Sequence, residues 1–235
     1  MNDTILKLEN VEVSLGGRKI LNGIELEIGK GTQLAILGAS GSGKTVLAET
    51  LAGRHFYQGR ISSGFREPES FHRRVQLIDQ QHRFKDRITQ SSFYYQQRYN
   101  AQDATSSMHV RENLAYYPDF AAGGFHQEEL TDLFHLRELL DEPLIQLSNG
   151  ENKRLQIVKA LLTDHDLLIL DQPFTGLDAA GRELLSQMLN QLAQKGEQMI
   201  LITSPRDIPA CFTKVVLMDW GRIVREGRPA DFPAA

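Results

Sequence analysis

The sequence predicts an α/β fold with a largely parallel sheet, and three observations lead to that prediction. Apolar runs of strand length recur at 34–37, 167–170, 199–203 and 215–218, as is typical of parallel strands covered on both faces. Segments with helical signals lie between these runs. Residues 5–28 instead alternate short apolar runs with turns, which predicts a small N-terminal antiparallel sheet with one wet face.

Composition places the chain among ordinary globular proteins. It has 235 residues, of which 41% are hydrophobic and 24% charged, and a single cysteine, Cys211, so no intrachain disulfide framework is expected. The net charge of -4 disfavours a nucleic-acid binder. The N-terminus does not resemble a secretory signal, and no apolar run approaches the ~20 residues of a membrane helix. We therefore expect a cytoplasmic protein without direct membrane insertion, which meets a membrane only as a peripheral partner.

The first part of the chain is expected to build the antiparallel sheet and then the first parallel strand. Strands are predicted at 5–8, 11–13, 20–21 and 24–28, with Gly16-Gly17 as a hairpin turn. A helix from 44 to about 52 should follow strand 34–37 and end at Gly53, because glycine commonly stops a helix.

The middle of the chain predicts a helical insertion. Residues from about 81 to 146 are rich in glutamine, aromatic and charged residues and lack apolar strands. Helices are expected at 110–116 and 128–140. The aromatic stretch Phe93–Tyr99 is either part of the packing of this insertion or a surface that docks a partner.

The last third returns to α/β alternation. A helix is predicted at 149–162, followed by strand 167–170 and a second helix that Asp178 caps and Gly196 ends. Strands at 199–203 and 215–218 come next, and a turn at 220–222 leads into a short strand at 223–224.

A complete phosphate-binding motif lies between strand 34–37 and the following helix. The pattern G-x-x-x-x-G-K-[ST] is formed by Gly38, Ala39, Ser40, Gly41, Ser42, Gly43, Lys44 and Thr45. Its glycines let backbone N–H groups curl around phosphate oxygens, and the helix N-terminus attracts the same charge. Lys44 would bind the terminal phosphates, and the Thr45 hydroxyl would bind Mg²⁺.

Two further segments complement this loop. Asp171 ends the apolar strand 167–170, at the edge of a parallel sheet where ligands bind, so it is a candidate Mg²⁺ ligand beside Thr45. Ser148 and Glu151 fit a capping box at the start of the next helix. The same helix N-terminus is also a candidate anion site, and the two interpretations are compatible.

Taken together, these motifs resemble the ATP-binding domain of ATP-binding-cassette (ABC) proteins over essentially the whole chain. Leu147–Glu151 is similar to the LSGGQ signature of that family, Leu167–Pro173 to its Walker B strand, and Gly176–Asp178 to its D-loop. The resemblance implies a phosphate-loop NTPase core with an N-terminal antiparallel β subdomain and a helical subdomain at about 81–146, all in one domain over 1–235. It also implies that two such domains enclose two ATP molecules, each signature (here Ser148 and Gly150) reaching the other domain's nucleotide.

The resemblance also assigns the remaining site residues. The strand 75–80 is similar to the one that ends in the glutamine loop of the family, with Gln80 as our choice and Gln81 as the alternative for the residue that contacts Mg²⁺ or the attacking water. Asp178 belongs to the D-loop, and Leu15 stands where an aromatic residue would stack on adenine.

Four positions depart from the family pattern. Gln172 follows Asp171 where the family has a glutamate, and an amide cannot accept the proton of an attacking water as a carboxylate does. Ser204 stands in place of the switch histidine. Leu15 lacks a π face, and Asn149 replaces the first signature glycine. We therefore predict a domain that binds MgATP but hydrolyses it slowly, with Gln80, Gln172 and Ser204 at the catalytic positions.

Three functions remain compatible with the sequence. The first is the ATP-binding subunit that powers an ABC transporter, with membrane-spanning subunits as partners. The second is a soluble cassette protein without a membrane partner, similar to the tandem cassettes of molybdenum-transport and photorepair proteins. The third is a regulatory module that senses ATP with little turnover. In each case a second cassette, identical or different, would complete the nucleotide sites.

Overall fold

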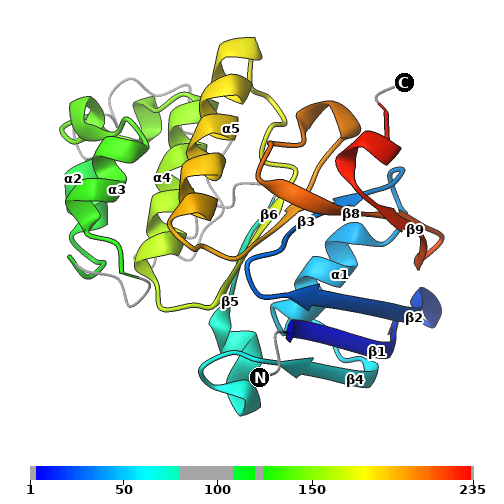
Figure 1. The fold of residues 1–235 in the computed structure, drawn as a ribbon. Coiled ribbons are helices and arrows are strands. Elements are labelled where there is room, and N and C mark those ends of the chain that lie inside the picture. The colour runs from blue at the N-terminus through cyan, green and yellow to red at the C-terminus, as the bar shows by residue number, and fades with distance from the viewer. Residues whose placement is uncertain (1–3, 80–107, 120–123, 234–235) are drawn as a thin grey trace.

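The computed structural model of the protein describes residues 4–79, 108–119 and 124–233, and it confirms the α/β fold (Figure 1). A six-stranded sheet has the order β5-β6-β7-β3-β8-β9. Neighbouring strands pair in parallel from β5 to β8, and β9 pairs with β8 in the antiparallel sense. The strands are β3 (Gln33–Leu37), β5 (Val75–Ile78), β6 (Leu167–Asp171), β7 (Met199–Ile202), β8 (Phe212–Asp219) and β9 (Arg222–Gly227). Each predicted parallel strand is therefore present.

The N-terminal sheet is antiparallel, as predicted, and has the order β2-β1-β4. Its strands are β1 (Thr4–Leu15), β2 (Arg18–Gly29) and β4 (Gln58–Ser63). The prediction of separate strands at 5–8 and 11–13 is wrong, because β1 is continuous, with a shift of register between Leu8 and Val11. The prediction of separate strands at 20–21 and 24–28 is wrong as well, because both lie in the continuous strand β2. The sequence reading also missed β4, a largely exposed strand that pairs with β1.

Five α-helices lie in the described residues: α1 (Lys44–Leu51), α2 (Val110–Leu114), α3 (Gln127–Leu133), α4 (Asn149–Leu162) and α5 (Ala179–Gln194). The helices predicted after 44, 149 and 178 are confirmed. Segments of 3-10 helix lie at Pro68–Arg74, Arg137–Leu139, Leu144–Gln146, Pro205–Asp207 and Pro229–Asp231.

The predicted helix 128–140 is wrong in its second half. It ends at Leu133, because His135 adopts a positive φ of 51°, which an α-helix cannot continue through. Leu136 beyond the break is still fully buried, which explains why the apolar pattern extended that far. The candidate residues Gln80 and Gln81 and the aromatic stretch Phe93–Tyr99 lie outside the described residues.

The six-stranded sheet separates two hydrophobic cores. Side chains alternate between its faces, so Leu34 and Ile36 of β3 pack with α1, β1 and β2, while Ala35 and Leu37 pack with α4 and α5. Figure 1 shows the same division, with α4 and α5 on one side of the sheet and α1 with the antiparallel strands on the other. The C-terminal ends of β3, β6, β7 and β8 therefore share one edge, where the site lies.

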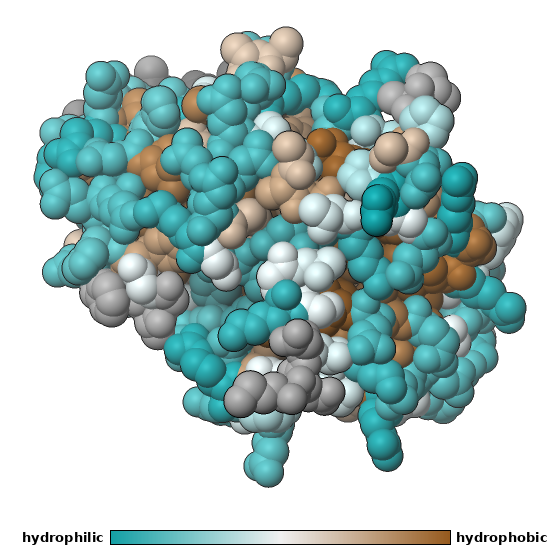
Figure 2. Space-filling model, in the orientation of Figure 1, coloured by the Kyte–Doolittle hydropathy of each residue, from teal (hydrophilic) through white to brown (hydrophobic). Residues whose placement is uncertain are grey.

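Every helix in the described ranges is too short or too polar to span a lipid bilayer. The face drawn in Figure 2 is covered mostly by hydrophilic side chains, with hydrophobic ones showing through in smaller areas.

Candidate nucleotide-binding site

The loop 38–43 connects the buried strand β3 to α1 in a shape that only glycine permits at its ends. A Cβ on Gly38 would lie 2.3 Å from the carbonyl oxygen of Met218 in β8. Gly43 has a φ of 100°, and a Cβ there would lie 3.0 Å from a methyl carbon of Leu21. The loop is therefore pressed against β8 on one side and β2 on the other, which holds its backbone N–H groups at the start of α1.

Lys44 is folded into this loop. Its side chain is buried, and its Nζ donates hydrogen bonds to the carbonyl oxygens of Gly38 (2.8 Å) and Ala39 (2.7 Å) and to Ser42 Oγ (3.2 Å). Burial lowers the pKa of Lys44, and the nearby carboxylate of Asp171 opposes that shift. An anion at the loop would favour the charged ammonium further, so Lys44 is suited to hold phosphate oxygens.

Thr45 and Asp171 meet, although they are far apart in the sequence. The Thr45 hydroxyl donates a hydrogen bond of 2.7 Å to Asp171 Oδ2. Asp171 is buried, and its other oxygen, Oδ1, has no hydrogen-bond partner among the described residues. Burial raises the pKa of Asp171, and the Thr45 bond opposes the rise.

A buried carboxylate oxygen without a donor is costly unless something else satisfies it, and a cation would do so. Hydroxyl and carboxylate oxygens at this position are the ligands that Mg²⁺ prefers. The described ranges contain no cluster of three or more His, Cys, Asp or Glu side chains that could hold a metal. The residues present therefore fit an ion held by few protein ligands, with room for substrate oxygens.

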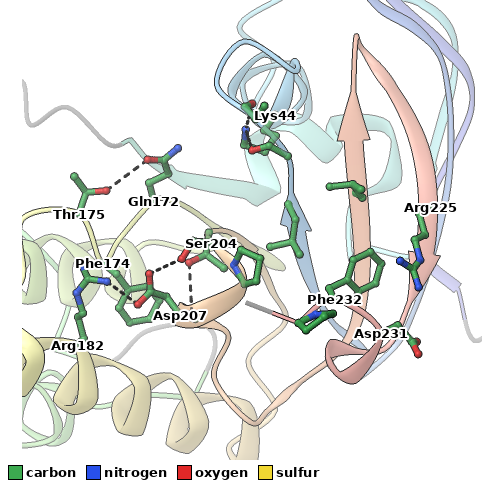
Figure 3. Close-up of a pocket in the computed structure, with 17 residues that line it drawn as sticks. Lys44, Gln172, Phe174, Thr175, Arg182, Ser204, Asp207, Arg225, Asp231 and Phe232 are labelled. Carbon is green, nitrogen blue, oxygen red and sulfur yellow. Dashed lines mark hydrogen bonds and ion pairs between the residues drawn. The ribbon is translucent and has the colours of Figure 1, made fainter. Parts of the chain in front are cut away.

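Gln172 and Ser204 line one cavity with Gly38, Ala39 and Lys44, at the ends of β6, β7 and β3 (Figure 3). The cavity has a volume of about 520 Å³. Gln172 has a positive φ of 49°, and its N–H donates to the carbonyl oxygen of Ile202 at 2.8 Å. Its Oε1 lies 3.5 Å from the Thr175 hydroxyl. Gln172 therefore lines the same cavity as the phosphate loop, with its amide beside Thr175.

The sequence analysis did not predict two residues near Ser204: Asp207, which contacts it, and Arg182, which contacts Asp207. The Ser204 hydroxyl donates to Asp207 Oδ2 at 2.8 Å, and Arg182 of α5 donates to Asp207 Oδ1 at 2.7 Å (Figure 3). Arg182 also donates to the carbonyl oxygen of Leu177, next to Asp178. Both Asp207 oxygens are therefore engaged, and this carboxylate links Ser204 to α5.

The two segments that resemble the family's signature, 147–151, and its D-loop, 176–178, lie elsewhere. Ser148 caps α4 in the predicted capping box: its Oγ accepts from Glu151 N at 3.3 Å, and Glu151 Oε2 accepts from Ser148 N at 2.7 Å. A Cβ on Gly150 would lie 3.4 Å from Leu177, so the signature and the D-loop are neighbours. Among the described residues that line the cavity there is no member of either segment. Within one chain the signature and Lys44 therefore do not share a site.

The other predicted residues are Asp178 and Leu15. Asp178 caps α5, its Oδ1 accepting from Gly181 N at 2.8 Å. Leu15 ends β1 at the hairpin and is 37% exposed, a position open to a ligand but without an aromatic ring.

Known proteins resemble this chain in sequence and in fold. A family model described as ABC transporter matches residues 21–175. The zinc import ATP-binding protein ZnuC of Halorhodospira halophila is 29% identical over 232 residues, 97% of this chain and 79% of that protein. The sulfate/thiosulfate import ATP-binding protein CysA of Escherichia coli is 29% identical over 236 residues, but the chain spans only 60% of its length. Among solved structures, cbiO1 from Clostridium perfringens, part of the ABC transporter complex cbiONQ, superposes with a TM-score of 0.71 at 24% identity, over 97% of this chain and 90% of that one.

Proposed function

This chain belongs to the ABC transporter family, and on that premise we propose that it is a MgATP-binding cassette that powers a membrane transporter. The observation that carries the proposal is the contact of Thr45 with Asp171 directly beside the Lys44 loop, with one Asp171 oxygen buried and unpartnered. Residues 1–235 would form one such domain, with the helical part at about 81–146 inserted in the α/β core.

In this proposal each residue type has a distinct task. The backbone of loop 38–45 binds the phosphates, and Lys44 supplies the positive charge at their end. Thr45, Asp171 and Gln80 would hold Mg²⁺, which neutralises charge on the terminal phosphates. Leu15 would pack on the adenine.

Turnover should be slow because of two side chains. Gln172 can orient a water molecule at the end of the triphosphate but cannot accept its proton. The Ser204 hydroxyl is hydrogen-bonded to Asp207, and Asp207 pairs with Arg182. Ser204 would therefore not replace the switch histidine of the family. The same two observations favour the alternative functions, a soluble non-transport cassette or a regulatory module that responds to ATP binding rather than to hydrolysis.

The signature segment and the phosphate loop of one chain lie apart, and this separation is the reason to expect a partner cassette. Ser148 and Gly150 would reach the nucleotide bound by Lys44 of a second cassette, and the D-loop residue Asp178 would lie at the same junction. The relatives named for zinc and sulfate/thiosulfate import support membrane-spanning subunits as further partners. The chain would then work at the cytoplasmic face of a membrane.

We expect an ATP-dependent dimer. A single cassette leaves one face of its nucleotide open, and the capped N-terminus of a second α4 offers N–H donors to the γ-phosphate. Light scattering should give the mass of two chains with MgATP and of one chain with MgADP. Slow hydrolysis should make the ATP-bound pair long-lived.

The matched control is Lys44→Ala, which should stay monomeric with either nucleotide. A wild-type chain that is monomeric in both conditions removes the homodimer. If adding a partner cassette that carries an intact signature also gives no ATP-dependent association, the two-site arrangement is wrong.

A further inference from the structure

The turn between β8 and β9 has an unfavourable residue at its first position. Asp219 pairs with Arg222, so Trp220 and Gly221 form a two-residue hairpin loop. Both have positive φ angles, 44° and 73°, as in the hairpin turns that prefer Asn-Gly. Tryptophan in this left-handed conformation is costly, because its Cβ crowds the backbone.

The Trp220 side chain is also 85% exposed. A large aromatic ring in water forgoes the burial that normally stabilises it. Trp220 thus combines an unfavourable backbone conformation with a ring that the described fold hardly covers, a combination that is typical of residues kept for a ligand.

This turn is fixed to the phosphate loop and to β2. Gly221 N donates to the carbonyl oxygen of Ser42 at 3.1 Å, and the carbonyl oxygen of Gly221 accepts from Asn22 N at 2.8 Å. The Asn22 side chain also donates to the carbonyl oxygen of Trp220 at 3.0 Å. Three hydrogen bonds therefore fix the backbone of this turn beside the phosphate loop.

The sheet order shows which part of a nucleotide would approach this turn. Asp171 ends β6 and Ser204 follows β7, and both strands lie on one side of β3. A triphosphate held by Lys44 would point its metal-bound end toward them. The other neighbours of the loop are β8 and β2, because Gly38 abuts Met218 and Gly43 abuts Leu21. The nucleoside end would therefore leave the loop on the side of β2 and the β8–β9 turn.

We propose that Trp220 stacks on the adenine of bound ATP and takes over the part that an aromatic side chain at the position of Leu15 would play. This inference rests on the proposed function, since it needs phosphates at loop 38–45. Leu15 offers only an aliphatic contact, whereas the indole presents a π face large enough to cover a purine. Trp220 then sets the affinity for the nucleoside, and Lys44 the affinity for the polyphosphate.

The chain has a single tryptophan, so its fluorescence reports on this residue alone. MgATP and MgADP should both quench the emission of the full chain, with saturation that does not depend on protein concentration. Magnesium tripolyphosphate, which has no base, should bind with little quenching. Trp220→Ala should weaken ATP binding by about 10- to 100-fold, the range that stacking on one base supports, and leave tripolyphosphate affinity unchanged.

Two variants serve as controls. Trp220→Phe keeps a ring and should retain most of the ATP affinity. Phe56→Ala removes a different exposed aromatic residue, between α1 and β4, and should change neither affinity nor quenching.

The outcomes separate this inference from the proposed function. If tripolyphosphate and ATP bind the wild type and Trp220→Ala binds ATP equally well, the stacking role is wrong while the phosphate site stands. If quenching appears only at protein concentrations that give dimers, and Trp220→Ala retains its ATP affinity, the ring contacts a second copy instead, and the inference is overturned. If neither ligand binds the wild type, the proposed function itself fails.

Discussion

Lys44→Ala is expected to abolish measurable MgATP binding, raising the dissociation constant by about 100-fold or more. Lys44 is buried and holds its ammonium against the carbonyl oxygens of Gly38 and Ala39 at the mouth of the loop. Charge-assisted hydrogen bonds to phosphate contribute about 1.5–3 kcal/mol each, and each 1.4 kcal/mol is a factor of ten in affinity. Isothermal titration calorimetry of wild type and variant measures the difference.

The control for this variant is Lys30→Ala, which removes an exposed lysine from the turn before β3. It should leave the affinity for MgATP unchanged. Thermal unfolding followed by circular dichroism checks that Lys44→Ala still folds, since it removes three hydrogen bonds within the loop. A folded Lys44→Ala that binds MgATP as the wild type does would refute the assignment of the loop.

Gln172→Glu is expected to raise the rate of ATP hydrolysis by about 10²- to 10⁴-fold, the usual contribution of a general base. The substitution keeps the length of the side chain, and the backbone bond from residue 172 to Ile202 holds it in the same place. The new carboxylate would face the cavity that Lys44 and Ser204 also line. Steady-state release of phosphate at saturating MgATP measures the gain.

A matched amide-to-carboxylate change, Gln191→Glu on the exposed face of α5, should leave turnover as it is. Ser204→His combined with Gln172→Glu restores both hydrolysis positions of the family. If neither Gln172→Glu nor this double variant hydrolyses ATP faster than the wild type, residue 172 does not occupy the position of the base.

Local sequence signals predicted the elements that carry the site. The loop 38–45 has its own motif, the capping box of Ser148 and Glu151 starts α4, and Asp178 starts α5. Elements that depend on distant partners were missed. Strand β4 has no alternation of its own and exists because it pairs with β1. The helix predicted to run to residue 140 stops early because of the backbone conformation of His135, which apolar spacing does not reveal.

The contacts of the site can also be divided into those that sequence motifs predicted and those that arise from tertiary contact. The motif and the Walker B resemblance predicted that Thr45 and Asp171 lie together, and the hydrogen bond between them agrees with this. The engagement of Ser204 by Asp207 and Arg182 could not be predicted, because it joins α5 to the turn after β7 through tertiary contact. The approach of Gly221 to Ser42 is equally non-local, since it joins the loop after β3 to the turn after β8, which are far apart in the sequence.

The fate of bound ATP tests the central claim most directly, namely that this cassette binds MgATP tightly and turns it over slowly. The wild-type chain is saturated with radiolabelled MgATP, separated from free nucleotide and sampled over time to determine the ratio of bound ATP to bound ADP. We expect about one bound nucleotide per wild-type chain. That nucleotide should still be ATP after an interval in which the Gln172→Glu variant has converted its bound ATP to ADP. Conversion by the wild type as fast as by the variant, or a wild-type chain that retains no nucleotide, would contradict the account.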